Sequence, residues 1–303
     1  MVTILGPTAA GKTRLAALLA DKAGGEVISA DSRQVYHGMD IGTGKDLDDY
    51  VVEGKTVPYH LVDIADPGTE YNVFLFQKDF LAAFDAVKKR NHLPVLCGGT
   101  GLYLEAVLNG YTLRQVPENA RLREKLRPLS DKELIDLLKS YGPLHNTTDI
   151  TDRQRTLRAI EIREYEKNHP AEEPFPKINS LTFGVKFPRE AVRRRITQRL
   201  KTRLENGMIE EVQRLLDNGL KPEQLTFYGL EYRYVTQYVT GELSYDEMFA
   251  RLNTAIHQFS KRQMTWFRRM EKRGMVIRWV DGLLPEPEKV AFCLEEMHKA
   301  GGI

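Results

Sequence analysis

The sequence has few of the residues that cross-link a chain or anchor it in a membrane. Its two cysteines, Cys97 and Cys293, stand far apart among 303 residues, so neither a disulfide framework nor a cysteine-rich zinc site is expected. No run approaches the roughly 18 consecutive apolar residues of a membrane-spanning helix. The apolar run at residues 2–5 leads directly into a glycine-containing loop and leaves no room for a signal peptide. These absences predict a cytoplasmic protein with no membrane partner.

The net charge is also small, at +2, but it is unevenly distributed. Residues 186–279 carry 19 basic against 11 acidic residues, a net +8, whereas residues 1–110 carry −4, residues 111–185 carry +1 and residues 280–303 carry −3. Clustered Lys and Arg attract phosphate groups and release counterions. The basic segment therefore predicts a polyanionic partner, and the alternative is a set of solvated helix faces.

Short apolar runs alternate with helical patterns over residues 1–110. Strands that alternate with helices imply a parallel sheet, and such a sheet binds its ligands at the carboxyl ends of the strands. Hydrophobic periodicity predicts strands at residues 2–5, 26–30, 59–64 and 93–97, and helices at residues 13–22 and 73–90.

The strand pattern is interrupted after residue 110. Residues 111–180 instead show short charged helical patterns, and they predict a helical insertion. A returning strand at residues 181–187 and long amphipathic helices follow it. The expected fold is an α/β core of residues 1–110 and 181–303 with a helical insertion at residues 111–180.

Residues 6–13 form the most specific motif in the chain. They match G-x-x-x-x-G-K-[ST] between a predicted strand and a predicted helix, which is the context of a P-loop. In such a loop the backbone N–H groups and the helix N-terminus bind phosphate, Lys12 reaches the outer phosphate, and Thr13 can hold Mg²⁺. The predicted diphosphate-binding residues are Gly6, Pro7, Thr8, Ala9, Ala10, Gly11, Lys12 and Thr13.

The residues alone leave open which acid accompanies the loop. An apolar strand that ends in a metal-binding aspartate is typical of P-loop enzymes, and both residues 60–63 and residues 27–31 could supply one. Asp31 is the stronger candidate because it follows a predicted strand beside the loop. It could serve as a metal ligand, as a general base or as the N-cap of the next helix.

Six segments in order along the chain resemble the tRNA dimethylallyltransferases, also called tRNA isopentenyltransferases, of the bacterial type without a zinc finger. This family alkylates the exocyclic amine of an anticodon-loop adenosine. The resemblance implies a P-loop NTPase-like parallel sheet with a tRNA-binding helical insertion. The matching segments are residues 6–13, Asp31-Ser32 with Tyr36 and residues 38–43, residues 60–64, residues 98–103, residues 152–161 and residues 261–267.

The resemblance implies that the loop holds the diphosphate of dimethylallyl diphosphate, with Mg²⁺ at Thr13. The adenine N6 would attack the allylic carbon as diphosphate departs, with Asp31 as the general base. Arg233 aligns with a family arginine that is implied to face the diphosphate, as suits a bidentate guanidinium. In this chain Glu231 replaces the glycine that usually precedes the tyrosine of that segment.

The resemblance also implies contacts to the anticodon stem-loop of tRNA, because the target base must leave the stack to reach a protein pocket. Asp31, Ser32, Arg33, Gln34 and Thr100 would contact the flipped nucleotide. From the insertion, the neighbouring nucleotides would be contacted by Arg121, Gln154, Arg155, Thr156, Leu157 and Arg158.

The basic run at residues 186–203, which has a single acid, Glu190, is predicted to contact tRNA phosphates. We expect a monomeric enzyme that prenylates the adenosine 3′ of the anticodon. The alternatives are an adenylate isopentenyltransferase that uses a free nucleotide, a P-loop small-molecule kinase and a non-enzymatic RNA-binding protein. The insertion and the +8 segment favour tRNA, because a mononucleotide needs no such surface.

Overall fold

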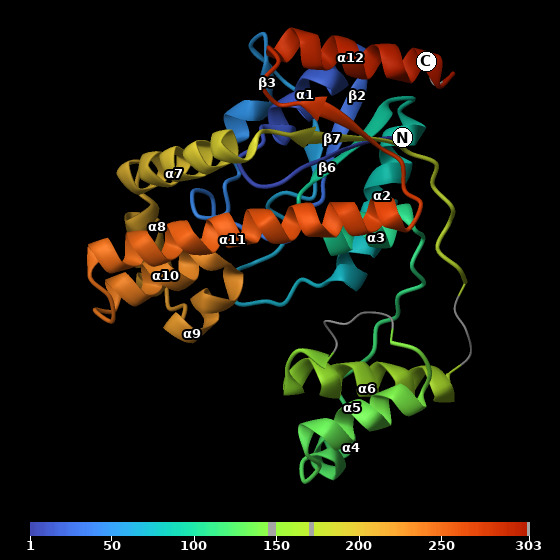
Figure 1. The fold of residues 1–303 in the computed structure, drawn as a ribbon, viewed down its shortest axis with the longest axis vertical. Coiled ribbons are helices and arrows are strands. Elements are labelled where there is room, and N and C mark those ends of the chain that lie inside the picture. The colour runs from blue at the N-terminus through green and yellow to red at the C-terminus, as the bar shows by residue number, and fades with distance from the viewer. Residues whose placement is uncertain (145–149, 170–172, 302–303) are drawn as a thin grey trace. The chain divides into compact units, whose positions relative to one another are not determined.

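A computed structural model describes residues 1–144, 150–169 and 173–301. The chain divides into two compact units, Met1–Gly110 with Pro176–Ile303, and Tyr111–Phe175. Figure 1 labels their helices and strands. Residues 145–149 and 170–172 of the predicted insertion lie outside the described part.

The first unit contains a sheet with the strand order β5-β2-β6-β1-β7-β8, in which every pair is parallel. The parallel α/β sheet predicted from the sequence is therefore confirmed. A separate antiparallel pair joins β3 (Val51–Val52) to β4 (Lys55–Thr56), after the 3₁₀ helix η1 (Leu47–Tyr50). The strands of the sheet are β1 (Val2–Leu5), β2 (Gly25–Ser29), β5 (Tyr59–His60), β6 (Leu93–Gly98), β7 (Leu181–Lys186) and β8 (Ile277–Asp281).

Two strand predictions need correction. The strand predicted at residues 59–64 ends at His60, because Leu61 and Asp63 have positive φ angles of 62° and 52°. These residues form a loop whose backbone bonds to residues 34 and 35. The sequence pattern also missed β8, which pairs with β7 at the edge of the sheet.

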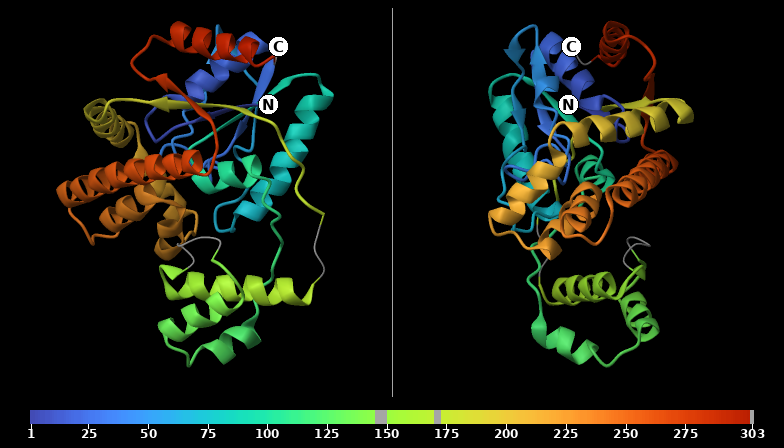
Figure 2. Two further views of the ribbon diagram at one scale, coloured as in Figure 1. Left: turned by 45° about the vertical axis from the view of Figure 1, so that its right-hand side comes forward. Right: turned by 90° about the vertical axis from the view of Figure 1, so that its left-hand side faces the viewer.

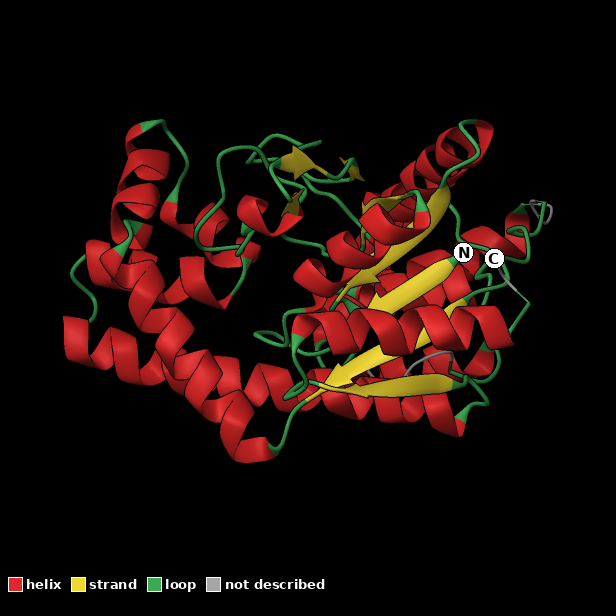
Figure 3. Cartoon of the chain, turned by 90° about the horizontal axis from the view of Figure 1, so that it is seen from above, coloured by secondary structure: helices red, strands yellow, loops and turns green. Residues whose placement is uncertain are grey.

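Helices cover both faces of the sheet (Figure 3). Helices α1 (Lys12–Ala23) and α12 (Glu286–Lys299) contact each other, and they share a buried cluster with Val27 and Val95 of the strands. Because successive residues of a strand point to opposite faces of the sheet, the second face also presents side chains that need cover. The other face is covered by α2 (Val73–Lys89), which contacts β2 and β6, and by α3 (Gly101–Leu108), which contacts α2.

The remaining helices of this unit form a second buried cluster that includes Ala9 of the P-loop and Tyr36. Helix α11 (Tyr245–Lys272) contacts α10 (Leu230–Val239) and α7 (Arg189–Glu205), and Figure 2 shows α11 beside α10. The P-loop is thus packed against helices as well as against the sheet. Between α7 and α10 lie α8 (Met208–Asp217), α9 (Pro222–Leu225) and the 3₁₀ helix η3 (Thr226–Tyr228).

The second unit is built from α4 (Ala120–Leu126), α5 (Asp131–Ser140) and α6 (Arg153–Asn168). Its core contains Leu126, Leu134 and Leu138. The buried Glu161 accepts hydrogen bonds from the guanidinium of Arg123 at 2.7 and 3.0 Å and thereby ties α4 to α6. None of the helices in the described parts of either unit is long and apolar enough to cross a membrane.

A buried carboxylate ties strand β2 to its neighbours. The side chain of Glu26, only 3% exposed, accepts two hydrogen bonds of 2.7 Å from Arg90, and its oxygens lie 2.6 Å from His60 Nε2 and from His92 Nδ1. These hydrogen bonds, that of Arg90 first, hold the pKa of Glu26 at about 2. Because the pKa is depressed in the folded state, the stabilisation is present above about pH 4.5 and is lost as the pH falls towards 2.

We therefore expect Glu26→Gln to lower the free energy of unfolding by about 2 kcal/mol at pH 7, and by roughly half as much at pH 3. Urea unfolding at the two pH values measures both differences. The matched control is Glu53→Gln, whose side chain is 81% exposed and should change the stability little at either pH. Equal losses for Glu26→Gln at both pH values would contradict the linkage.

Candidate active site

Three loops gather at the carboxyl edge of the sheet. The P-loop at residues 6–13 follows β1, Asp31 follows β2, and the turn at residues 98–101 ends β6. Since β2, β6 and β1 are neighbours and parallel, their carboxyl ends lie side by side. This is the edge at which ligands of parallel α/β sheets bind.

The P-loop has the backbone shape of an anion cradle. Gly11 adopts a left-handed conformation (φ 70°) as the N-cap of α1, and Ala9 is also left-handed (φ 60°). Alternating right- and left-handed residues aim successive N–H groups at one point, and the N-terminus of the following helix adds its dipole. At Gly6 a Cβ would approach Val185 O to 3.0 Å, so the close contact with β7 favours glycine there.

Gln263 on α11 joins the P-loop to the neighbouring turn. Its Oε1 accepts from the Thr8 N–H at 2.8 Å, and its Nε2 donates to Gly99 O at 2.9 Å. The Thr8 amide is therefore engaged by a protein group, which leaves the amides further along the loop for a ligand. The side chain of Gln263, which is distant in the sequence, thus holds the first part of the P-loop in place.

Lys12 lies at the centre of the site. Its side chain passes beside Gly99, since a Cβ at Gly99 would lie 3.4 Å from Lys12 Cε. Burial lowers the pKa of Lys12, while the nearby charges of Asp31 and Asp46 act to raise it. A bound anion would act in the same direction as these carboxylates.

Asp31 caps a turn, not a helix. Its Oδ1 accepts from the Arg33 N–H at 3.0 Å, and residues 31–42 contain bends, turns and one isolated β-bridge but no helix. The next residue, Ser32, donates its N–H to Thr100 Oγ1 at 3.1 Å, which connects the turn to the end of β6. The N-cap alternative for Asp31 is therefore excluded, because no helix begins there.

The other candidate acid, Asp63, is engaged elsewhere. The buried Lys45 donates to Asp63, to Asp40 Oδ1 at 2.7 Å and to Tyr36 O at 2.6 Å. Asp63 thus stabilises a loop away from the P-loop. Among the residues that the structure describes, no group of three or more His, Cys, Asp or Glu side chains is arranged to hold a metal ion.

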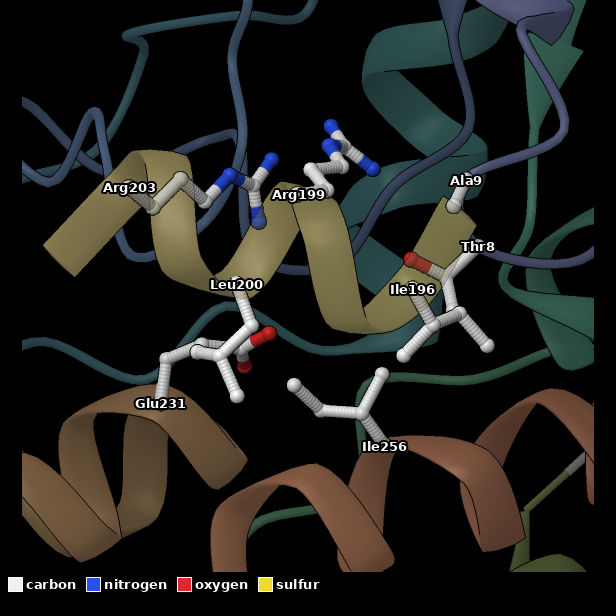
Figure 4. Close-up of a pocket in the computed structure, with 8 residues that line it drawn as sticks. All are labelled: Thr8, Ala9, Ile196, Arg199, Leu200, Arg203, Glu231 and Ile256. Atoms are coloured by element: carbon white, nitrogen blue, oxygen red, sulfur yellow. The ribbon is translucent and has the colours of Figure 1, made fainter. Parts of the chain in front are cut away.

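A small pocket opens beside the P-loop (Figure 4). Its wall combines aliphatic side chains with two arginines from α7 and one acid from α10. Burial raises the pKa of Glu231, against the opposing effect of Arg203. The lining residues are Thr8, Ala9, Ile196, Arg199, Leu200, Arg203, Glu231 and Ile256.

Three arginines of α7 face this site. Arg195 Nε donates to Ala9 O at 2.8 Å, and its guanidinium lies over the ring of Phe187 at 4.7 Å. Arg199 and Arg203 pair with Asp46, Arg203 at 3.6 Å. All three belong to the basic run at residues 186–203, which is predicted to contact tRNA phosphates, and the charge pattern alone does not indicate their position beside the P-loop.

Asp46 and Gly44 accommodate these guanidinium groups. At Gly44 a Cβ would lie within 3 Å of both Arg203 and Arg199, so only glycine leaves room for them. Two buried nitrogens of Arg203, Nε and Nη2, have no hydrogen-bond partner. The pocket therefore holds positive charge that is only partly neutralised.

Arg233 does not lie in this pocket. It is exposed, and its guanidinium lies 5.8 Å from the centre of the Tyr234 ring. Glu231, two residues earlier on the same helix, lines the pocket instead. Two residues on a helix are about 200° apart, so they cannot face the same side.

Comparison with known proteins shows the family to which the chain belongs. The family model described as IPP transferase matches residues 34–270, and that described as isopentenyl transferase matches residues 1–59. A curated tRNA dimethylallyltransferase 2 from Bacteroides fragilis is 57% identical over 98% of this chain and 97% of its own length. A tRNA dimethylallyltransferase 1 from Porphyromonas gingivalis is 57% identical over the whole of both chains.

The chain belongs to the IPP transferase family of tRNA dimethylallyltransferases. Among solved structures, a tRNA isopentenylpyrophosphate transferase from Bacillus halodurans is similar, with a TM-score of 0.70, 30% identity, and coverage of 100% of this chain and 99% of that one. A eukaryotic dimethylallyltransferase has a similar fold, with a TM-score of 0.77 and 21% identity, and covers 99% of this chain and 79% of its own.

The residues of the first unit that are predicted to contact the flipped nucleotide differ in which of their side-chain groups already have partners within the protein. Ser32 and Thr100 contact each other at the end of β6, and both are half-buried. Gln34 is engaged within the fold, since it donates to Gly44 O at 2.9 Å and accepts from Ser29 Oγ at 3.3 Å. Arg33 is half-buried, and its guanidinium lies over the ring of Phe227.

In the second unit, the residues that are predicted to contact tRNA are partly exposed and partly buried. Arg121, Gln154 and Arg155 are exposed. Thr156 and Leu157 are buried, Leu157 in the core of the unit. Burial of Leu157 does not fit the prediction that its side chain reaches a nucleotide.

Arg158 of the second unit is held within the fold. Its guanidinium donates to Val116 O at 2.6 Å and to the buried Glu161 at 3.2 Å. The exposed residues Arg121, Gln154 and Arg155 therefore remain the side chains most open to a ligand among those predicted here.

Proposed function

We propose that the protein transfers the dimethylallyl group of dimethylallyl diphosphate to N6 of the adenosine 3′ of the anticodon in tRNA. The bond between C1 and the diphosphate oxygen breaks, the bond between C1 and N6 forms, and N6 loses a proton. The observation that carries the proposal is the meeting of an anion-binding loop and Asp31 at one edge of the sheet. Family membership supports the same reaction.

In this proposal the P-loop binds the diphosphate. The donors are the backbone N–H groups of Ala9, Ala10, Gly11, Lys12 and Thr13. Gln263 accepts the Thr8 N–H, so Thr8 would serve through its side chain, and Pro7, which follows Gly6 at the start of the loop, has no N–H to donate. Lys12 and the guanidinium groups of Arg195 and Arg199 supply positive charge at the place where the departing diphosphate gains negative charge. Preorganised charge at the leaving group is the largest catalytic contribution available to such a site.

Asp31 accepts the proton that N6 loses. Its carboxylate is fixed by the Arg33 N–H and is half-buried at the end of β2. A carboxylate held within about 3 Å of the amine suits this role. The resemblance implies that Arg233 faces the diphosphate, but Arg233 does not line the pocket beside the P-loop. We assign this role to Arg199, which lines that pocket, and to Arg195, which binds Ala9 O of the loop.

Mg²⁺ fits the residues of this site if most of its ligands come from the substrate. Mg²⁺ retains several waters and commonly takes only one or two protein ligands besides phosphate oxygens. Thr13, at the start of α1, is positioned as the protein ligand of a P-loop metal. When bound, the ion would neutralise charge on the departing diphosphate.

The test of the proposed function is a transfer assay with labelled dimethylallyl diphosphate and three acceptors: tRNA, AMP and a tRNA whose adenosine 3′ of the anticodon is replaced by guanosine. We expect label in the unaltered tRNA alone. Label in AMP would favour an adenylate isopentenyltransferase. ATP consumption without alkyl transfer would favour a kinase, and binding of tRNA with no product from any donor would favour a non-enzymatic RNA-binding protein.

Different arginines of α7 should affect the binding of the two substrates, tRNA and dimethylallyl diphosphate. Arg193 and Arg194 are exposed, so replacing both with alanine should weaken tRNA binding and lower its salt slope by about one unit per lost phosphate contact. Arg195→Ala should instead raise the KM for the diphosphate donor, because Arg195 binds Ala9 of the P-loop.

Salt titrations of tRNA affinity and donor saturation curves measure the two effects. The matched control is Arg214→Ala, which removes an exposed arginine from α8 and should leave the donor KM unchanged. An unaltered salt slope for the Arg193 and Arg194 variant would show that these residues form only a solvated face.

A further inference from the structure

An exposed aromatic ring lies next to the turn that carries Asp31. Phe227 in the 3₁₀ helix η3 is 54% exposed, although a phenylalanine of this size usually lies in the core. The guanidinium of Arg33 lies over its ring, 5.4 Å from the centre. Arg33 is also the residue whose N–H binds Asp31, at 3.0 Å. Phe227 is therefore linked to the proposed catalytic carboxylate through one residue.

The outward position of Phe227 is imposed by its neighbour. The Tyr228 ring is buried and meets the Tyr36 ring edge-on, with centroids 4.6 Å apart. The Tyr228 hydroxyl accepts the Gly68 N–H and lies 3.4 Å from Thr69 O, to which it donates. Because Tyr228 anchors the turn inward, Phe227 is held outward in a defined place.

The turn ends in a conformation that only glycine adopts readily. Gly229 has φ 133° and ψ −177°, a region of backbone conformation that is essentially restricted to glycine. A Cβ at Gly229 would lie 3.9 Å from Arg33 Nε and 3.8 Å from Glu231 Oε2. Gly229 thus lies between Arg33 and the acid that lines the pocket.

The Arg33 guanidinium also keeps its donors available. In the parts of the chain that the structure describes, it takes part in no ion pair and no side-chain hydrogen bond, and it lies over the ring of Phe227. An arginine over an aromatic ring with free N–H groups is suited to a ligand that combines a flat π-face with a nearby phosphate. An unpaired nucleotide has both features.

We propose that Phe227 and Arg33 form a stacking platform for an unpaired base of the anticodon loop that neighbours the target adenosine. This inference rests on tRNA being the substrate. The ring would stack on the base, and the guanidinium would donate to the adjacent phosphate. The platform would hold the loop open while the adenosine occupies the site at Asp31, which lowers the cost of unstacking that base.

The experiment uses the full chain and a synthetic anticodon stem-loop that carries 2-aminopurine next to the target adenosine. Its fluorescence falls when the base stacks on an aromatic ring. We expect Phe227→Leu to weaken stem-loop binding about tenfold, within the ~5- to ~150-fold range that corresponds to one lost stacked base, and to abolish the fluorescence change. Phe227→Trp should retain both, and the KM for dimethylallyl diphosphate should not change.

The matched control is Tyr245→Leu, which removes a 45% exposed aromatic ring at the start of α11 and should alter neither signal. Unfolding midpoints of all variants verify that the fold is intact. If Phe227→Leu binds the stem-loop with unchanged affinity and unchanged fluorescence while the wild-type protein still prenylates tRNA, the platform is wrong and the proposed function stands. If the wild-type protein prenylates no tRNA, the proposed function itself fails.

Discussion

Replacing Asp31 with asparagine is expected to lower the rate of prenyl transfer by about 10²–10⁴-fold and to leave the affinity for tRNA nearly unchanged. Asparagine retains the oxygen that accepts the Arg33 N–H at 3.0 Å, so the turn after β2 should keep its shape. It cannot take a proton from the adenine N6. The loss should therefore fall on the chemical step, which single-turnover kinetics at saturating tRNA and donor measure directly.

The control for this experiment is Asp48→Asn, which removes an exposed carboxylate from η1. It should leave the single-turnover rate within twofold of the wild-type value. An Asp31→Asn protein with the wild-type rate would show that Asp31 only orders its turn. A large loss of tRNA affinity with an unchanged single-turnover rate would make Asp31 a binding residue.

The sequence predicted those features that depend on neighbours along the chain. The loop at residues 6–13 is a local pattern between a strand and a helix, and the left-handed Gly11 and the start of α1 at Lys12 follow from it. Asp31 was placed correctly at the end of a strand for the same reason. Only the structure could exclude the N-cap alternative for Asp31, because aspartate is common both at the first position of turns and at the N-cap of helices.

Features set by partners distant in the sequence could not be predicted. Gln263 binds the Thr8 amide across 255 residues, and nothing near either residue indicates the contact. Strand β8 is stabilised by its pairing with β7. Its five residues, which follow the 28-residue helix α11, are too short a pattern to predict a strand by themselves. Long-range hydrogen bonds decide both cases.

Helix rotation explains why neighbouring arginines of the basic run have different contacts. Arg193, Arg194 and Arg195 are consecutive, and each step along a helix turns by about 100°. All three are exposed, but Arg195 alone of the three donates to the P-loop, through its Nε to Ala9 O. The same geometry separates Glu231 from Arg233 on α10. A basic run read only by its charge cannot reveal which members face the site.

Replacing Lys12 with methionine should lower the rate of prenyl transfer by roughly 10²–10³-fold, because the departing diphosphate loses the ammonium group that stabilises it. Methionine keeps the length and apolar stem of the side chain beside Gly99. Inorganic diphosphate should also inhibit the variant less strongly than the wild type. The control is Lys22→Met, at the other end of α1, where the side chain is 53% exposed; an unchanged rate for Lys12→Met would remove Lys12 from the site.

The pH dependence of donor use follows from the environment of Lys12. Burial lowers its pKa in the free protein, so the ammonium form is lost at a lower pH than for an exposed lysine. Bound diphosphate adds negative charge and raises that pKa. Because kcat/KM reports the free enzyme and kcat the complex, kcat/KM for dimethylallyl diphosphate should decline on the alkaline side before kcat does. In Lys12→Met this separation should disappear, and its persistence would assign the titration to another group.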